Sequence, residues 1–193
     1  MNSVINDKKL STSSIPSSQG NSRVALICFG GTAYNHSIRS IASYLRAQKY
    51  NVSIIQCLPE GEGDVFSLLN KRQLEQLAKH CEGMLAIGIS VLTTHYLNRA
   101  IQINNYMNEK LNIPVVWGGV PVICDPEYYL RHCDYVCTGE GEYFLTDFLG
   151  NIINGNNLLE TKGLAYKKED GGIVTNGTLP SLDVNEIPLP LFD

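Results

Sequence analysis

Largely apolar segments recur between residues 24 and 137, separated by stretches with a different pattern. The segments are residues 24–29, 52–57, 84–90, 114–117 and 135–137. Apolar runs without regular polar alternation are typical of strands that are covered on both faces, as in a parallel sheet. We therefore interpret these segments as five buried strands.

The stretches between the strands carry apolar residues at helical spacing. We expect a helix at 36–49 with Asn35 as N-cap, one starting at Asp64, one at 94–111, one at 126–132, and one after Glu142 that reaches about Ile153. Strands and helices that alternate in this way predict an α/β fold with right-handed crossovers. The predicted architecture is a doubly wound five-stranded parallel sheet, flavodoxin-like, in the order 2-1-3-4-5.

Three regions differ in character and suggest the domain boundaries. Residues 1–22 are polar and serine-rich, which predicts a disordered leader, and residues 23–155 form the expected α/β domain. In residues 156–193, two short apolar segments flank Glu169-Asp170-Gly171, which indicates a β-hairpin. The prolines after Leu179 then predict an extended linker.

Composition narrows the class of protein further. Hydrophobic residues make up 44% of the 193 residues and the formal net charge is −4, so a packed core is expected and no basic surface for nucleic acid. No stretch approaches the roughly 18 apolar residues of a membrane span, and the leader lacks the apolar core of a secretory signal. The six cysteines are scattered without a Cys-x-x-Cys pair, which argues against structural zinc and favours a reduced, cytoplasmic protein.

The candidate site lies where the parallel strands end, since ligands of doubly wound sheets bind beyond the carboxyl ends of the strands. The loops expected there are 30–34, 90–94, 118–121 and 139–142, and all are rich in glycine, hydroxyl-bearing or small residues. Each loop alone has a plainer explanation, such as a tight turn or an acidic first turn of a helix. Their shared location favours a site at which backbone approaches a large ligand.

Several motifs in these loops resemble those of a known family. Ser90-x-Leu92 followed by Gly118-Gly119 is similar to two signatures of cobalamin-binding domains. Segments 115–120, 134–142, 163–166 and 187–190 resemble the region that precedes the catalytic barrel of cobalamin-dependent radical-SAM (S-adenosylmethionine) enzymes. The resemblance implies that the serine hydrogen-bonds the nucleotide tail of cobalamin and that the glycines leave room for it. The implied cofactor contacts are Gly31, Thr32, Ala33, Tyr34, Ser90, Leu92, Thr93, Gly118, Gly119, Val120, Glu140, Gly141 and Glu142.

The chain also departs from these families in two ways. The signature Asp-x-His-x-x-Gly, which supplies an axial ligand to cobalt, is reduced here to His36. His36 is a candidate axial ligand, although a surface histidine at the start of a helix is the favoured alternative. The Cys-x3-Cys-x2-Cys run that holds a 4Fe–4S cluster is missing, so the cluster and SAM are expected only in an absent domain.

The leading hypothesis is thus a cobalamin-binding module that is not catalytic alone. By resemblance it belongs to a radical-SAM enzyme, which we expect to be a methyltransferase. Its partner would be the radical-SAM catalytic domain, in the same polypeptide or in a separate chain. One alternative is a degenerate domain that has lost cobalamin and serves as a structural or interaction module. The other is a flavin or nucleotide binder, for which Gly30-Gly31-Thr32 lacks the spacing of a phosphate-binding fingerprint.

Overall fold

One mixed sheet forms the centre of the molecule. The computed structural model describes residues 22–30, 35–58 and 67–190. The sheet has seven strands in the order β2-β1-β3-β4-β5-β6-β7. They are β1 (Arg23–Phe29), β2 (Asn51–Cys57), β3 (Ala86–Ser90), β4 (Val115–Gly118), β5 (Tyr135–Cys137), β6 (Leu164–Lys167) and β7 (Ile173–Thr175). The first five are parallel in the predicted order, whereas the last two run antiparallel.

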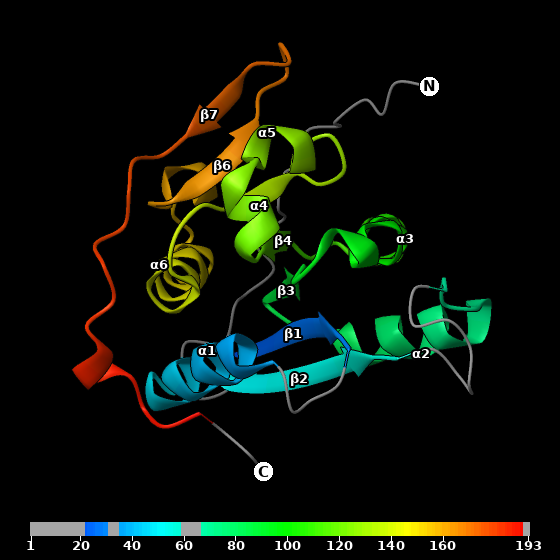
Figure 1. Ribbon diagram of the computed structural model, residues 1–193, viewed down its shortest axis with the longest axis horizontal. Helices are drawn as coiled ribbons and strands as arrows, with labels where there is room; N and C mark the ends of the chain where they lie inside the picture. The colour runs from blue at the N-terminus through cyan, green and yellow to red at the C-terminus, as the bar shows by residue number, and fades with distance from the viewer. Residues whose placement is uncertain (1–21, 31–34, 59–66, 191–193) are drawn as a thin grey trace.

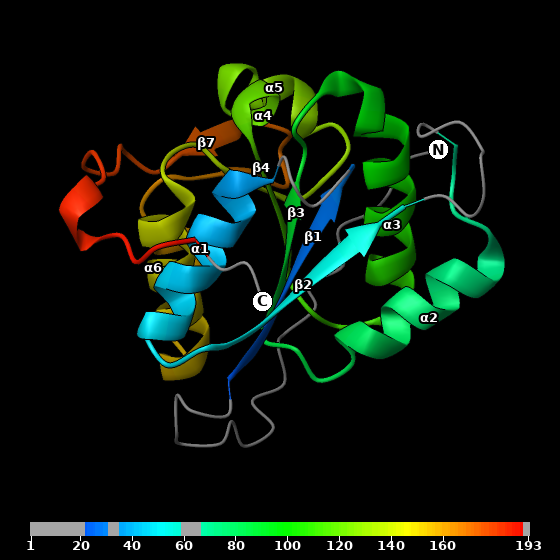
Figure 2. The same cartoon turned by 60° about the horizontal axis from the view of Figure 1, so that its bottom comes forward.

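Helices cover both faces of the sheet. In Figure 2, α1 (His36–Ala47) and α6 (Gly141–Asn154) lie on one face, and α2 (Lys71–Cys81) and α3 (Leu97–Lys110) lie on the other. Two short helices, α4 (Val120–Cys124) and α5 (Pro126–Tyr129), stand at the end toward which the parallel strands point. Single 3₁₀ turns occur at η3 (Thr94–Tyr96), η4 (Leu158–Glu160) and η5 (Val184–Glu186).

The two helical layers explain why β1 is apolar and buried from Val24 to Phe29. Ala25, Ile27 and Phe29 belong to the core cluster that includes residues of α2 and α3. Val24, Leu26 and Cys28, which alternate with them, belong to the cluster that includes residues of α1 and α6. Successive side chains of a strand point to opposite faces, so a strand buried on both sides has no polar position to offer. The predicted doubly covered sheet is confirmed.

The sheet has seven strands, not the predicted five, because the predicted hairpin is part of the same sheet. β6 pairs with β5, and β7 pairs with β6, so the hairpin extends the parallel sheet by two antiparallel strands. Its turn is closed by a hydrogen bond from the Lys168 amide to the Gly172 carbonyl, 2.7 Å long. The Asp170 carboxylate also accepts from the Gly172 amide at 2.8 Å. After β7 the chain runs beside α6 toward α1 (Figure 1).

Two helix starts also differ from the sequence-based expectation. The described part of α2 begins at Lys71, with Asn70 and Gln73 forming a reciprocal capping box; Asp64, the expected cap, lies outside the described residues. The segment after Gly119, expected to be a loop, forms α4, in which Pro121 occupies the first turn, where its missing N–H is not needed. Within the described residues, no helix is long and apolar enough to cross a membrane.

Candidate functional site

Ser90 and Gly118 lie directly opposite each other at the carboxyl ends of β3 and β4. Ser90 also pairs with Cys28 on its other side, which places it in the middle of the parallel strands. The ladder ends with a 2.8 Å hydrogen bond from the Val91 amide to the Gly118 carbonyl. The two predicted contacts from separate loops are therefore brought together by strand register.

Among the described residues, the glycine at position 118 leaves space beside Ser90. A Cβ added there would have one described neighbour within 4 Å, the Cβ of Cys137, at an ordinary contact distance of 3.8 Å. No left-handed backbone angle requires glycine at this position. Since neither packing nor conformation demands glycine, the missing side chain fits a backbone that a ligand approaches closely.

Gly119 is glycine for a different reason. Its φ angle is +118°, a conformation that residues with a side chain rarely adopt. A Cβ there would lie 2.9 Å from the carbonyl carbon of Val91 and closer still to the carbonyl oxygen. The fold itself thus requires Gly119, whether or not a ligand is bound.

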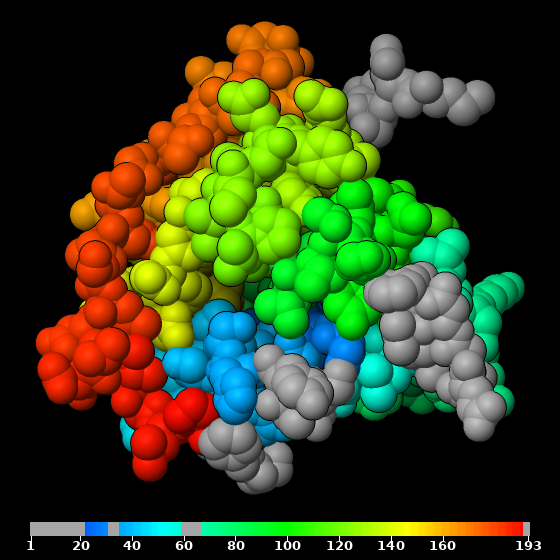
Figure 3. All heavy atoms as spheres, in the orientation of Figure 1, coloured from blue at the N-terminus to red at the C-terminus, as the bar shows by residue number. Residues whose placement is uncertain are grey.

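Exposed apolar side chains surround these strand ends. Val120 and Ile123, one turn apart on α4, are 67% and 40% exposed, and Leu92 is 38% exposed. Thr93 is half-buried and precedes the turn η3. Figure 3 shows α4 in light green and the start of α3 in green on this side of the molecule, next to α1 in blue. Such an edge offers an apolar surface for a large, flat ligand or another protein domain.

The loop after β5 is packed against the protein more than the sequence suggested. Glu142 is buried, and its carboxylate accepts a 2.8 Å hydrogen bond from the Ser40 hydroxyl on α1. A Cβ at Gly141 would lie 2.6 Å from the Cδ1 atom of Ile41, also on α1. Burial raises the pKa of Glu142, an effect that the Ser40 hydrogen bond opposes. Of the two acidic candidates in this loop, only Glu140 is exposed.

The candidates Gly31, Thr32, Ala33 and Tyr34 lie outside the described residues, but the ends of their loop are anchored. The Asn35 amide group is buried and donates a 3.1 Å hydrogen bond to the Phe29 carbonyl. Tyr96 stacks on Phe29 with ring centroids 5.3 Å apart, and its hydroxyl oxygen is 2.8 Å from where a Gly30 Cβ would lie. The Gln56 side chain donates to the Gly30 carbonyl.

These three anchoring residues were not among the predicted site residues. Asn35 carried a signal, since it was expected as the N-cap of α1, and it does occupy that position. Its side chain makes no capping hydrogen bond, however, and turns back to β1 instead. Gln56 and Tyr96 had no local signal, because their partner Gly30 is distant in sequence.

His36 is exposed as the first residue of α1. Among the residues that the structure describes, no three His, Cys, Asp or Glu side chains are grouped so that they could hold a metal ion. The described groups at this end of the sheet are backbone, hydroxyl and apolar groups, together with the exposed carboxylate of Glu140. Such groups can hold an organic ligand by hydrogen bonds and apolar contact.

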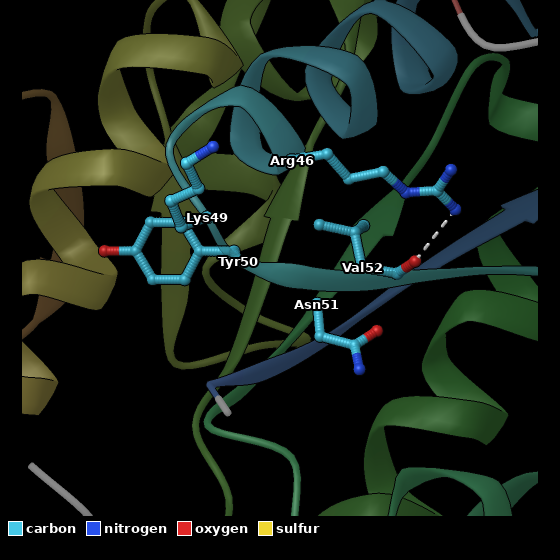
Figure 4. Close-up of a pocket in the computed structure, with 5 residues that line it drawn as sticks. All are labelled: Arg46, Lys49, Tyr50, Asn51 and Val52. Carbon is cyan, nitrogen blue, oxygen red and sulfur yellow. Dashed lines mark hydrogen bonds between the residues drawn. The ribbon is translucent and has the colours of Figure 1, made fainter. Parts of the chain in front are cut away.

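A hollow elsewhere on the molecule is unrelated to this site. It is lined by Arg46, Lys49, Tyr50, Asn51 and Val52 (Figure 4). Arg46 is already engaged there, because its guanidinium donates a 3.2 Å hydrogen bond to the Val52 carbonyl. The hollow lies where β2 begins, at the amino ends of the parallel strands, whereas Ser90 and Gly118 lie at the carboxyl ends.

Comparison with known proteins gives the family of the domain. The family described as the B12 binding domain matches residues 22–149. An uncharacterized methyltransferase of Pyrococcus horikoshii is 32% identical over 111 residues, which are 55% of this chain and 24% of that protein. An anaerobic magnesium-protoporphyrin IX monomethyl ester cyclase of Synechocystis is 26% identical over 136 residues, 65% of this chain and 26% of the relative. The chain thus spans about a quarter of these relatives.

Solved structures show the same fold. The cobalamin-dependent SAM radical enzyme OxsB, with aqua-cobalamin and SAM bound, superposes with a TM-score of 0.69 at 22% identity, over 88% of this chain and 24% of that one. The radical SAM methyltransferase TsrM from Kitasatospora setae, with cobalamin and a 4Fe–4S cluster bound, gives 0.64 at 17% identity, over 87% and 31% of the two chains. At these identities the likeness concerns the fold alone.

Proposed function

The chain belongs to the family of B12-binding domains, and we propose that it binds cobalamin at the carboxyl ends of β3 and β4. The observation that carries this proposal is the pairing of Ser90 with Gly118 beside open space. A hydroxyl donor next to a glycine with no packing reason for its missing side chain is what an inserted nucleotide tail would need.

The surrounding residues have separate proposed roles. Ser90 would hydrogen-bond the nucleotide tail, and Gly118 would leave room for it. Leu92, Thr93 and Val120 would contact the apolar parts of the cofactor, since two of them are exposed at this edge. In the loop after β5, Glu140 is exposed and would face the ligand, while Gly141 and Glu142 hold α6 against α1.

Residues 31–34 would cover the lower face of the corrin. Their loop begins and ends at the anchored residues Gly30 and Asn35, which lie next to the end of β1. His36 follows this loop on α1, exposed. We propose that the chain would hold cobalamin without needing His36.

The chain's own contribution is binding and orientation. When bound, cobalamin supplies group-transfer chemistry of its own, and the protein determines which face of it is accessible. The apolar residues on α4 lie at the same edge and would meet whatever domain lies above the cofactor.

We assign that neighbouring position to a radical-SAM catalytic domain, with SAM and a 4Fe–4S cluster, in the same polypeptide or a separate chain. The support comes from the solved relatives OxsB and TsrM, named as radical SAM enzymes, of which this chain covers 24% and 31%. A curated relative named as a methyltransferase agrees with this assignment. Methyl transfer in the cytoplasm is the proposed activity of that assembly.

The test is reconstitution of the full chain with hydroxocobalamin. After removal of free cofactor, we expect corrin absorbance to remain with the protein at one equivalent per chain. Protein without corrin bands would contradict the proposal and favour a structural module. Retained yellow flavin absorbance would favour a flavin-binding protein of the same shape.

A further inference from the structure

Two glycines from separate loops form a notch near the carboxyl ends of the parallel strands, where cobalamin is proposed to bind; this end of the sheet is called the cofactor edge below. Gly139 follows β5, and Gly163 precedes β6. They are held together because the amide and the hydroxyl of Thr138 both donate to the Gly163 carbonyl, at 2.8 and 2.9 Å. Without side chains, the pair leaves a gap on the surface of the sheet end.

Leu179 fills this notch. Its Cδ1 atom is 3.2 Å from where a Gly139 Cβ would lie and 2.9 Å from where a Gly163 Cβ would lie. The side chain is partly buried and packs on the core cluster beneath α1 and α6. Leu179 therefore packs against the loop that leads into Glu140 and the start of α6.

Residues 179–189, called the strap below, then cross both helices of this face. The Tyr143 hydroxyl on α6 donates a 3.0 Å hydrogen bond to the Glu186 carboxylate of the strap. The Ser43 hydroxyl on α1 donates a 2.6 Å hydrogen bond to the Leu189 carbonyl. Figure 1 shows this course in orange and red, along α6 and past α1.

The strap thus ties together two helices that each start at the cofactor edge. α1 begins after the loop that follows β1, and α6 begins after the loop that follows β5. Glycine-containing loops are the most easily opened parts of such an edge, because glycine has the largest backbone freedom. A side chain packed on Gly139 and Gly163 restricts that freedom.

We propose that Leu179 is a positioning residue for the cofactor: by filling the Gly139–Gly163 notch it holds residues 138–142 in the conformation that accepts cobalamin. This role rests on the proposed function. Through the same contact, the strap would connect the cofactor edge to any domain that follows the strap.

The test compares Leu179→Ala, Leu179→Met and Leu189→Ala in the full chain. Leu189 is 89% exposed in the same strap and serves as the matched control. Hydrogen exchange of residues 138–142 is measured without cofactor, and hydroxocobalamin affinity is measured by absorbance titration. We expect L179A to speed hydrogen exchange of residues 138–142 about fivefold or more and to weaken hydroxocobalamin affinity by a similar factor. In L179M, exchange and affinity should both stay close to those of the parent chain. L189A should change neither.

Unchanged exchange at 138–142 in L179A would overturn the proposed anchoring. Faster exchange with unchanged cobalamin affinity would overturn the link to the cofactor. If the parent chain binds no hydroxocobalamin, the proposed function fails. Hydrogen exchange of residues 138–142 then still tests whether Leu179 anchors that loop. If L179A does not fold, Leu179→Val provides a milder change with the same two readouts.

Discussion

Gly119 and Val91 approach so closely that any Cβ at position 119 would overlap the Val91 carbonyl group. The neighbouring Gly118 has no such restriction, since the one described residue that its added Cβ would meet is Cys137, at an ordinary contact distance. Two adjacent glycines of one motif thus differ in what they do. The fold requires Gly119, whereas Gly118 has no requirement of that kind and fits the proposed cofactor site.

This difference predicts opposite effects for the two positions. Gly118→Val should change stability by less than about 1 kcal/mol, because the valine suits a strand, and should weaken hydroxocobalamin binding by more than about tenfold. Gly119→Ala should destabilise the fold by about 3 kcal/mol or more, since strain and overlap add. Urea unfolding and absorbance titration measure the two effects.

Gly150→Ala is the control for both. Gly150 lies inside α6 with nothing within 4 Å of an added Cβ, so alanine should stabilise the chain by about 0.5–1 kcal/mol without altering binding. If G118V binds hydroxocobalamin as tightly as the parent chain, the proposed tail position is wrong.

Glu142 should make stability depend on pH. Burial raises its pKa above the ordinary 4.5, so in the window just above 4.5 the folded chain holds this proton more tightly than the unfolded chain. Stability should therefore fall as pH rises through the raised pKa. Glu142→Gln keeps an acceptor for Ser40 but carries no charge, and it should flatten this part of the profile.

Urea unfolding between pH 4.5 and 7.5 would measure the slope, with Glu127→Gln, exposed on α5, as control. A Glu142→Gln profile as steep as that of the parent chain would show that Glu142 is not the group responsible.

The six thiols should differ sharply in reactivity. Burial raises the pKa of Cys28 to about 11 and those of Cys57 and Cys137 to about 12, whereas Cys124 is exposed on α4. Because the thiolate is the reactive form, a thiol reagent at pH 8 should label one cysteine quickly in the folded chain and all six after unfolding. Cys124→Ser should abolish the fast phase, and a second fast thiol would contradict the burial.

His36 should be dispensable for cofactor binding. Its side chain is exposed at the start of α1, so His36→Ala should leave both the affinity for hydroxocobalamin and its absorbance spectrum unchanged. His80→Ala, exposed on α2, is the matched control. A spectral shift specific to H36A would instead assign His36 as an axial ligand.

Much of the site was predictable because strand order places loops. In the predicted order 2-1-3-4-5 the third and fourth strands are neighbours, so their loops are expected side by side, and Ser90 and Gly118 do pair. Glu142 shows the limit of this reasoning. Its partner Ser40 is 102 residues away, so its sequence position suggested an exposed loop carboxylate where the structure has a buried one.

The sequence by itself determined the five buried strands, because burial on two faces leaves a local apolar signature. Their order, and with it the end of the sheet where a ligand would bind, was predicted from the flavodoxin-like architecture. Only the tertiary structure decided which glycine makes room for a ligand, how the hairpin joins the sheet and where Leu179 packs. Those outcomes depend on contacts between distant segments, and the packing of one surface on another leaves no periodic trace in either segment.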